Sequence, residues 1–171
     1  MTGNVSDSVT INGLGANRLI LRRNTGGEYR ILQFNGGITA AIQGLTISNG
    51  IGTNGPGGIL NGGTLTITNC AITGNQASGD FGGGIFNVGI MNIVGSTISG
   101  NTAGDGAGLM NQNGSTTLTN TTISGNSAST FAGGIENLGN GGIVCSVTLI
   151  NCTITNNTGP TEDGIATVDN D

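Results

Sequence analysis

Short strings in which apolar and polar residues alternate recur along the chain at a nearly constant distance. The most regular string places one isoleucine between two hydroxyl-bearing residues, as in Thr46-Ile47-Ser48. This isoleucine returns at positions 72, 98, 123 and 154, so the intervals are 25, 26, 25 and 31 residues. Self-similarity at such a period is typical of solenoids and other repeat architectures. The longer last interval indicates an insertion, which we place around residues 139–144.

Two further strings keep the same interval, and turn residues follow each of them. One is first seen at residues 58–61 (GILN) and the other at residues 65–69 (LTITN). Three short strands per repeat predict an all-β fold, the right-handed parallel β-helix, with three strands in each coil of 25–26 residues. A propeller blade would need four strands and about 40 residues. We expect about five full coils, with partial coils at the ends.

The pattern predicts a single β-helix domain over residues 1–171. Residues 9–49 are interpreted as divergent first coils and residues 50–157 as regular coils. Residues 158–171 are interpreted as the start of a further coil or as an acidic tail. Neither end carries an amphipathic helix or a polar capping repeat, which solenoids usually need. The chain therefore resembles a piece of a longer solenoid or a unit that stacks end to end.

Asparagine recurs at two equivalent positions in successive coils. Coils of a β-helix lie about 4.8 Å apart, so equivalent side chains form columns. Stacked asparagines can pair amide to amide, and asparagine tolerates a left-handed backbone at bends. We expect two structural asparagine ladders, Asn61, Asn87, Asn111 and Asn137 in one column and Asn75, Asn101, Asn126 and Asn157 in the other.

The composition excludes several classes of function. The net charge of −5 argues against nucleic-acid binding, which needs a basic face. No apolar run reaches the roughly 20 residues of a membrane span. The chain has no His, and its four cationic residues are all arginines, so carboxylates are the remaining general bases. No general base, general acid and cation cluster on one coil face. We therefore assign no catalytic residue, no cofactor and no enzymatic activity.

Three strings resemble a known style of repeat. Residues 82–87 (GGGIFN), 65–69 (LTITN) and 97–101 (TISGN) are similar to repeats of bacterial right-handed β-helix surface proteins, including the chlamydial polymorphic outer membrane protein repeats. The resemblance covers roughly residues 9–168. It implies an extracellular or cell-surface location and a structural or adhesive module, with surface glycans as one class of partner. Relatives in the pectin-lyase-like group imply the alternative, a polysaccharide-binding or polysaccharide-degrading lyase or hydrolase.

One pair of acids is a candidate for a metal site. Asp80 and Asp105 fall in the same turn of adjacent coils, close enough to share a Ca²⁺ ion. The next coil has Ser129 and Thr130 there and offers no third acid. The plainer interpretation is a pair of solvated loop carboxylates. Glu136 stands alone in a strand column that is otherwise apolar.

The charges at the two ends of the chain differ in sign. We expect the arginines to be solubilising or, in a head-to-tail homopolymer, to meet the acids of the next copy and build a filament. The residues concerned are Arg18, Arg22, Arg23 and Arg30 near the start, and Glu162, Asp163, Asp169 and Asp171 near the end.

Hydroxyl side chains flank the repeated isoleucine on its outward side, as Thr97 and Ser99 do. Such files resemble ice-binding solenoids, which is a lesser alternative function, although threonine also suits any strand surface. Cys70 and Cys152 fall in one column but three coils apart, too far for a disulfide. A Cys145–Cys152 disulfide and two unbridged thiols both stay open.

Overall fold

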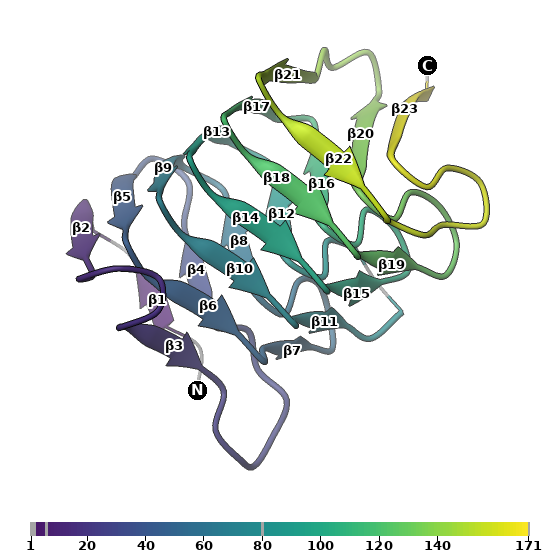
Figure 1. Cartoon of the computed structure of the whole chain (residues 1–171). Helices are drawn as coiled ribbons and strands as arrows, with labels where there is room; N and C mark the ends of the chain where they lie inside the picture. Colours follow the sequence, from purple (N-terminus) through teal and green to yellow (C-terminus); the bar gives the residue numbers. More distant parts are fainter. Residues whose placement is uncertain (1–2, 6, 80, 171) are drawn as a thin grey trace.

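The chain winds as a right-handed parallel β-solenoid of about six turns, and no helix occurs among the described residues. The structure is a computed structural model, and it describes residues 3–5, 7–79 and 81–170. Every pair of neighbouring strands is parallel, and each strand pairs with its equivalent in the next turn. Figure 1 shows the turns stacked from the N-terminal strands at the lower left to the C-terminal strands at the upper right.

Three long sheets form the walls, and in each sheet the first and last strands of the chain lie at opposite edges. Sheet A contains β1 (Gly3–Val5), β4 (Leu32–Phe34), β8 (Ile59–Asn61), β12 (Ile85–Asn87), β16 (Leu109–Gln112), β20 (Ile135–Asn140) and β23 (Ile165–Asn170). Sheet B contains β2 (Val9–Asn12), β5 (Thr39–Gln43), β9 (Thr64–Thr68), β13 (Ile90–Val94), β17 (Ser115–Thr119) and β21 (Ser146–Ile150). Sheet C contains β3 (Ile20–Arg22), β6 (Thr46–Ser48), β10 (Ala71–Thr73), β14 (Thr97–Ser99), β18 (Thr122–Ser124) and β22 (Thr153–Thr155).

A fourth, short sheet follows sheet C in the middle turns, which the sequence did not predict. Sheet D contains β7 (Ile51–Gly52), β11 (Gln76–Ala77), β15 (Thr102–Ala103) and β19 (Ser127–Ala128). Two-residue strands are too short for an alternation of apolar and polar residues to be visible. The expectation of three strands per coil therefore corresponds to sheets A, B and C. The expected full coils with partial coils at the ends correspond to the about six turns of the structure, and the divergent first strands pair in register with the regular ones.

The interior is a narrow column of aliphatic side chains. In sheet C the repeated isoleucines pair with one another from turn to turn, and Ile47, Ile72, Ile98 and Ile123 are completely buried. Strand residues alternate between this interior and the surface, as the sequence pattern requires. Each turn thus buries equivalent aliphatic side chains, and these make the same few contacts from turn to turn along the axis.

Two columns of asparagine side chains run through the turns, each amide donating to the next. The Nδ2–Oδ1 distances are 2.8, 2.8 and 2.7 Å from Asn61 to Asn137. They are 3.1, 2.9 and 2.9 Å from Asn75 to Asn157. The side chains also bond backbone groups, as where Asn101 Nδ2 donates to Ile72 O at 3.1 Å. All eight asparagines are buried.

The left-handed backbone falls on other residues than the ladder asparagines, contrary to the sequence expectation. Positive φ occurs at Asn49 (59°), Gly74 (62°) and Gly100 (62°), the corner positions that come one residue before the second ladder column. These corners are exposed, whereas the ladder side chains lie inside. The two roles are therefore separate: one residue bends the backbone and the next pairs the turns.

Candidate functional site

The outward side of sheet A is covered by the loops that lead into its strands. Gly106 has φ of 54°, and a Cβ there would lie 3.0 Å from the Met110 Cα and Cβ. In the preceding turn, a Cβ added at Gly82 would likewise lie 3.0 Å from the Phe86 Cβ. The glycines let the loops lie directly on the strands. Met110, at a position that would face solvent on an open sheet, is consequently buried, and Phe86 is partly buried.

Glu136 is one of these covered side chains, and only 3% of its surface is exposed. It stands between Met110 and Ala166 in its column. Its Oε2 atom is buried and has no hydrogen-bond partner. Burial, and second the negative charge of Asp105, raise the pKa of Glu136 to about 7.

Asp105 shares this environment from the covering loop. Its Oδ1 atom is also buried and without a partner, and burial raises the pKa of the carboxyl group. Two carboxyl groups that repel each other therefore lie in one covered region of an uncharged sheet face. They form the most perturbed titratable cluster among the described residues.

The predicted partner of Asp105 for a shared Ca²⁺ ion was Asp80, which lies outside the described residues. Phe81 is the residue in register with Asp105, through an isolated bridge between the two loops. The Phe81 ring packs on Phe86 with 6.1 Å between ring centroids. Among the described residues, no three metal-ligating side chains gather in one place. The signal for the Glu136 cluster was a single acid in an apolar strand column.

The arginines lie in the first turns, and two of them are held by their own chain. Arg30 is half-buried and donates to Pro56 O at 3.0 Å, to Gln33 Oε1 at 2.6 Å and to Asn54 O at 3.2 Å. Burial lowers the pKa of its guanidinium group. Arg23 Nε donates to Asn49 O at 3.0 Å. These two side chains fasten the wide first loops to the next turn.

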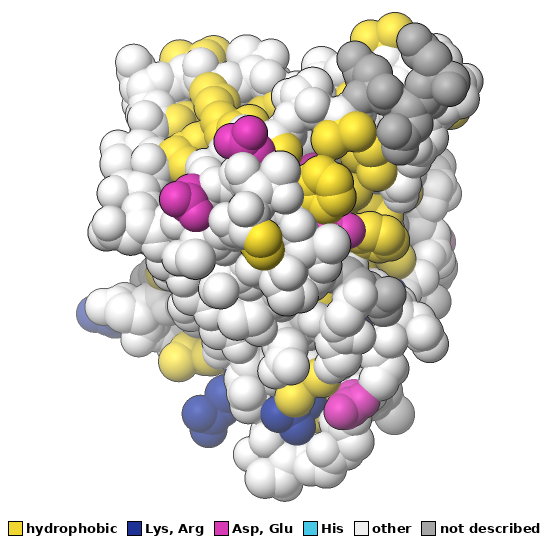
Figure 2. All heavy atoms as spheres, turned by 90° about the vertical axis from the view of Figure 1, so that its right-hand side faces the viewer, with side chains coloured by type: hydrophobic (Ala, Val, Ile, Leu, Met, Phe, Trp, Pro, Cys, Tyr) yellow, Lys and Arg dark blue, Asp and Glu magenta, His cyan; other side chains and the backbone are white. Residues whose placement is uncertain are grey.

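Arg18 and Arg22 are exposed, and so are Glu162 and Asp163 at the opposite end. The Asp163 carboxylate accepts the Gly159 N–H at 3.0 Å. Figure 2 shows the arginines at the height of the first turns and most acidic side chains higher up. Asp171 lies outside the described residues, as does the side chain of Asp169. The described part of the acidic end is thus the loop before β23.

Hydroxyl side chains form two outward files on sheet C. Equivalent positions of neighbouring strands are in register from β6 to β22, for example Thr97 with Thr122 and Ser99 with Ser124. Ser99 Oγ donates to Thr73 Oγ1 at 3.3 Å. No charged side chain interrupts the files between β6 and β22. The face is regular and neutral.

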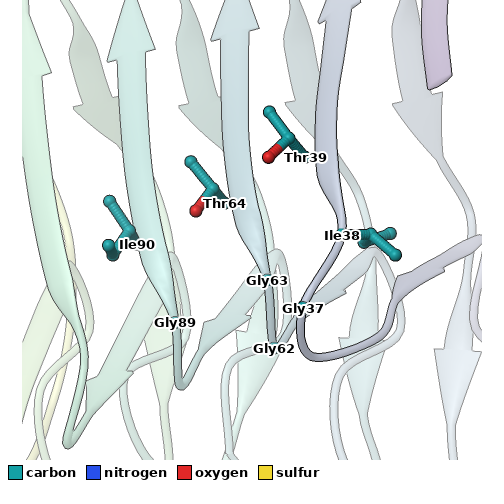
Figure 3. A pocket seen from close by; sticks show the side chains of 8 residues that line it. All are labelled: Gly37, Ile38, Thr39, Gly62, Gly63, Thr64, Gly89 and Ile90. Carbon is teal, nitrogen blue, oxygen red and sulfur yellow. The ribbon is translucent and has the colours of Figure 1, made fainter. Parts of the chain in front are cut away.

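A shallow groove of about 230 Å³ lies at the bend between sheets A and B. Glycines line its floor, and Thr39, Thr64 and Ile90 project beside one another from β5, β9 and β13, as Figure 3 shows. Ile90 is 59% exposed. The lining residues include no charged side chain, so the groove offers backbone groups, threonine hydroxyls and the apolar side chains of Ile38 and Ile90.

Cys70 and Cys152 are unbridged thiols in the structure. Cys70 is buried, its Sγ lies 3.3 Å from Thr68 O, and burial raises the pKa of its thiol. Cys152 is partly exposed in the last turn, with its Sγ 3.4 Å from Leu118 O. Cys145 lies in the loop that contains the predicted insertion.

Comparisons with protein-family models, curated proteins and solved structures found no match to this chain. The class of protein is therefore defined by the fold: a parallel β-solenoid repeat protein. The likeness to chlamydial and pectin-lyase-like repeats rests on the sequence strings alone. Within the described residues, there is no helix of the length and apolarity needed to cross a membrane.

Proposed function

We propose that this chain is a rigid structural or adhesive module of an extracellular or cell-surface protein. The observation that carries the proposal is the pair of asparagine ladders, which join successive turns through buried hydrogen bonds in addition to the sheets. A buried amide that is fully paired adds rigidity and fixes the register of its neighbours. The turns are therefore tied together at two corners as well as along three walls.

Such a stack resists being pulled apart because each turn is bonded to the next through many parallel contacts. Repeat proteins unfold by breaking interfaces between neighbouring units, so strong interfaces make the whole array cooperative. A surface protein gains from this a stiff spacer that holds its outer faces in fixed positions. Surface glycans are the class of partner that the neutral hydroxyl and amide faces would suit.

Single-molecule pulling between the ends of the chain tests the proposal. We expect cooperative rupture of several turns at one force, and a lower force for Asn101→Ala, which interrupts one ladder. Asn92→Ala, at an exposed outward position, is the matched control. Successive rupture of single turns at low force, unaffected by Asn101→Ala, would contradict a mechanical role.

The alternative of a polysaccharide lyase or hydrolase is tested separately. Incubation with acidic polysaccharides, with and without Ca²⁺, should release no new reducing ends or unsaturated products if the module is structural. The same samples, passed over immobilised polysaccharide, report binding without cleavage. Turnover that disappears in Glu136→Gln or Asp105→Asn would instead assign a catalytic role to the buried acids.

The regular files of sheet C favour one further candidate, an ice-binding face. Two neutral files of side chains are in register over five strands, and all but one of their members carry a hydroxyl group, the exception being Ala71 in β10. Thermal hysteresis measured on the wild-type chain and on Thr97→Lys, which places a charge in the middle of the file, tests this function. A hysteresis that the lysine leaves unchanged would exclude this face.

A further inference from the structure

Two carboxyl groups under the covered face of sheet A each keep an oxygen without a hydrogen bond. Among the described residues, Glu136 Oε2 and Asp105 Oδ1 are the buried side-chain atoms that no partner reaches. Only 3% of the Glu136 surface is exposed. Buried polar groups in proteins are nearly always paired, so two unpaired carboxyl oxygens at this depth call for a ligand.

The loop before β16 brings the two acids together. Met110 of β16 pairs with Glu136 of β20, so these side chains are neighbours in one column. Gly106 lies directly on the strand, since a Cβ there would be 3.0 Å from the Met110 Cα and Cβ. Asp105 precedes Gly106 and therefore reaches the same part of the sheet. After burial, its negative charge is the second cause of the raised pKa of Glu136, as expected of two carboxyl groups that lie close together.

The backbone of Asp105 is fixed by the loops on both sides. The Gly82 N–H of the preceding turn donates to Asp105 O at 2.9 Å. The Thr130 N–H of the following turn donates to Gly104 O at 2.9 Å. These bonds hold the loop in place but leave the Asp105 side chain unpaired at Oδ1. The carboxyl group is thus positioned without being satisfied.

The chain offers no cationic side chain that could neutralise these acids. Its four cationic residues lie at positions 18, 22, 23 and 30, and residues 31–171 contain no Lys, Arg or His. Arg23 and Arg30 are already bound to backbone carbonyls of the early turns. Two ionised carboxylates in one buried region repel each other and carry a high cost of desolvation. The balancing charge is therefore either a proton or a cation from solution.

The donor atoms define the class of cation. Two carboxyl groups supply four oxygens, and oxygen ligands select hard cations such as Ca²⁺ and Mg²⁺. Two negative charges match one divalent ion. Mg²⁺ gives up its water reluctantly and demands a regular octahedron, whereas Ca²⁺ accepts irregular geometry and bidentate carboxylates. A site in which one carboxyl group is almost fully buried therefore favours Ca²⁺.

An ion can reach the site from solvent on the side of Asp105, which is only partly buried. Water molecules on that side would supply the further ligands that Ca²⁺ takes, about six to eight in all. Phe81 is in register with Asp105, and its ring packs on Phe86. These rings make the surroundings apolar, and opposite charges attract more strongly where water is excluded.

We propose that Glu136 and Asp105 bind one Ca²⁺ ion between sheet A and the loop before β16. The ion joins β20 to a loop of the preceding turn and neutralises both acids. This site differs from the Asp80–Asp105 pair predicted from the sequence, because one of its ligands comes from a strand. The inference goes beyond the proposed mechanical role and does not depend on it.

Thermal unfolding and isothermal titration calorimetry of the chain, freed of metal with a chelator, test the proposal at pH 8. This pH lies above the pKa of about 7 of Glu136, so protons compete little. We expect one Ca²⁺ ion per chain. The melting temperature should rise with the CaCl₂ concentration, because the ion binds the native state. MgCl₂ should bind at least about tenfold more weakly.

Two variants and one control locate the ion. Glu136→Gln keeps the shape of the side chain but removes its charge, and it should abolish the rise in melting temperature. Asp105→Asn should raise the Ca²⁺ concentration for half-saturation at least about tenfold. Glu162→Gln is the matched control, since it removes an exposed acid from the equivalent loop of the next turn but one and should leave binding unchanged. Circular dichroism establishes that each variant is folded.

A measurement on the unmodified chain serves where a variant fails to fold. In carbon-detected NMR, the carboxyl signals of Glu136 and Asp105 should shift until one equivalent of Ca²⁺ is added, and that of Glu162 should not. Three results would overturn the proposal: no shift of these two signals, a melting temperature that ignores Ca²⁺, or equal binding by wild type and folded Glu136→Gln. Protons would then balance the acids. The pulling experiment, performed with a chelator present, does not involve this site, so the two proposals can fail independently.

Discussion

The asparagine ladders and the Asp105–Glu136 pair are both buried polar groups, and they differ in how they are satisfied. Each central ladder asparagine meets an identical side chain in the turns above and below. Glu136 has Met110 and Ala166 as its column neighbours, and one of its oxygens has no partner. In a solenoid, a buried polar side chain is stable when the same residue type recurs at the equivalent position of each turn and the side chains hydrogen-bond to one another. A solitary acid carries the full cost of burial.

The difference follows from the chemistry of the two side chains. An amide carries both donors and an acceptor, so a file of amides can pair head to tail without end. An ionised carboxylate only accepts, and a neighbour of the same kind repels it. The ladder therefore stabilises the fold at any pH near neutrality. The acid pair makes stability depend on pH.

Breaking a ladder in its middle should have the largest effect. Asn101→Ala removes the acceptor for two Asn75 N–H groups and the donor to Ile72 O. Leaving these buried groups unpaired, at about 1–3 kcal/mol each, should lower the free energy of unfolding by about 3–5 kcal/mol. Urea denaturation followed by circular dichroism measures it. The exposed Asn92→Ala should change stability by no more than about 0.5 kcal/mol. Equal losses in both variants would remove the distinction between ladder and surface.

Replacing Glu136, the solitary buried acid, should raise the free energy of unfolding rather than lower it. Glu136→Met restores the residue type of the preceding turn. The unfolded-state pKa is near 4.5 and the folded pKa is about 7, so the native state holds its proton more tightly. Stability contributed by the protonated form is complete below pH 4.5, falls as the pH rises to about 7, and is then lost. The variant should thus be more stable at pH 8 by roughly 3 kcal/mol.

Denaturation at pH 4 and pH 8 checks this, because the gain should shrink at the lower pH. The control is Glu162→Gln in the exposed acidic loop, where the gain should be small at both values. A Glu136→Met variant that is less stable at pH 8 would show that the carboxylate is held by contacts of its own.

The fold could be predicted from the sequence because its signals repeat. Ile47 and its equivalents recur in phase, and each recurrence confirms the interior column. The fourth sheet could not be predicted, since strands such as Gln76–Ala77 have no period of their own. Nor could the cover over sheet A, which depends on loops approaching through Gly82 and Gly106. That cover turns an outward position into a buried one.

The site was less predictable for the same reason. A single acid such as Glu136 occurs once, so no recurrence marks its environment. Asp105 was paired with Asp80 from their places in similar loops, and because Asp80 lies outside the described residues this pairing stays a prediction. The described partner of Asp105 in the preceding turn is Phe81, through an isolated bridge that the sequence did not indicate. Contacts between side chains on loops can therefore be predicted only once the three-dimensional register of the turns is known, whereas the asparagine ladders can be predicted from the sequence repeat.

Two threonine hydroxyl groups on one strand differ in a similar way, since one is buried and hydrogen-bonded and the other points outward, but the expected effect on stability is smaller. Thr116 is buried, its Oγ1 donates to Asn111 Oδ1 at 2.9 Å, and it accepts from Asn87 Nδ2 at 3.0 Å. Thr117 points outward on the same strand. Thr116→Val should cost about 1–1.5 kcal/mol, as loss of a buried hydrogen bond does, and Thr117→Val about 0.5 or less. Parallel urea titrations compare them, and a larger cost at Thr117 would contradict the assignment of the two faces.

The smallest change should come from removing the neighbour of Glu136. Asp105→Asn eliminates a negative charge but leaves the burial, which is the larger cause of the raised pKa of Glu136. The pKa should fall only part of the way toward 4.5, and stability at pH 8 should rise by about 1 kcal/mol or less. A carbon-detected NMR titration of the Glu136 carboxyl group reads the pKa directly, with Asp163→Asn as the control. If the pKa returned fully to 4.5, repulsion by Asp105 rather than burial would be what separates this acid from the ladder.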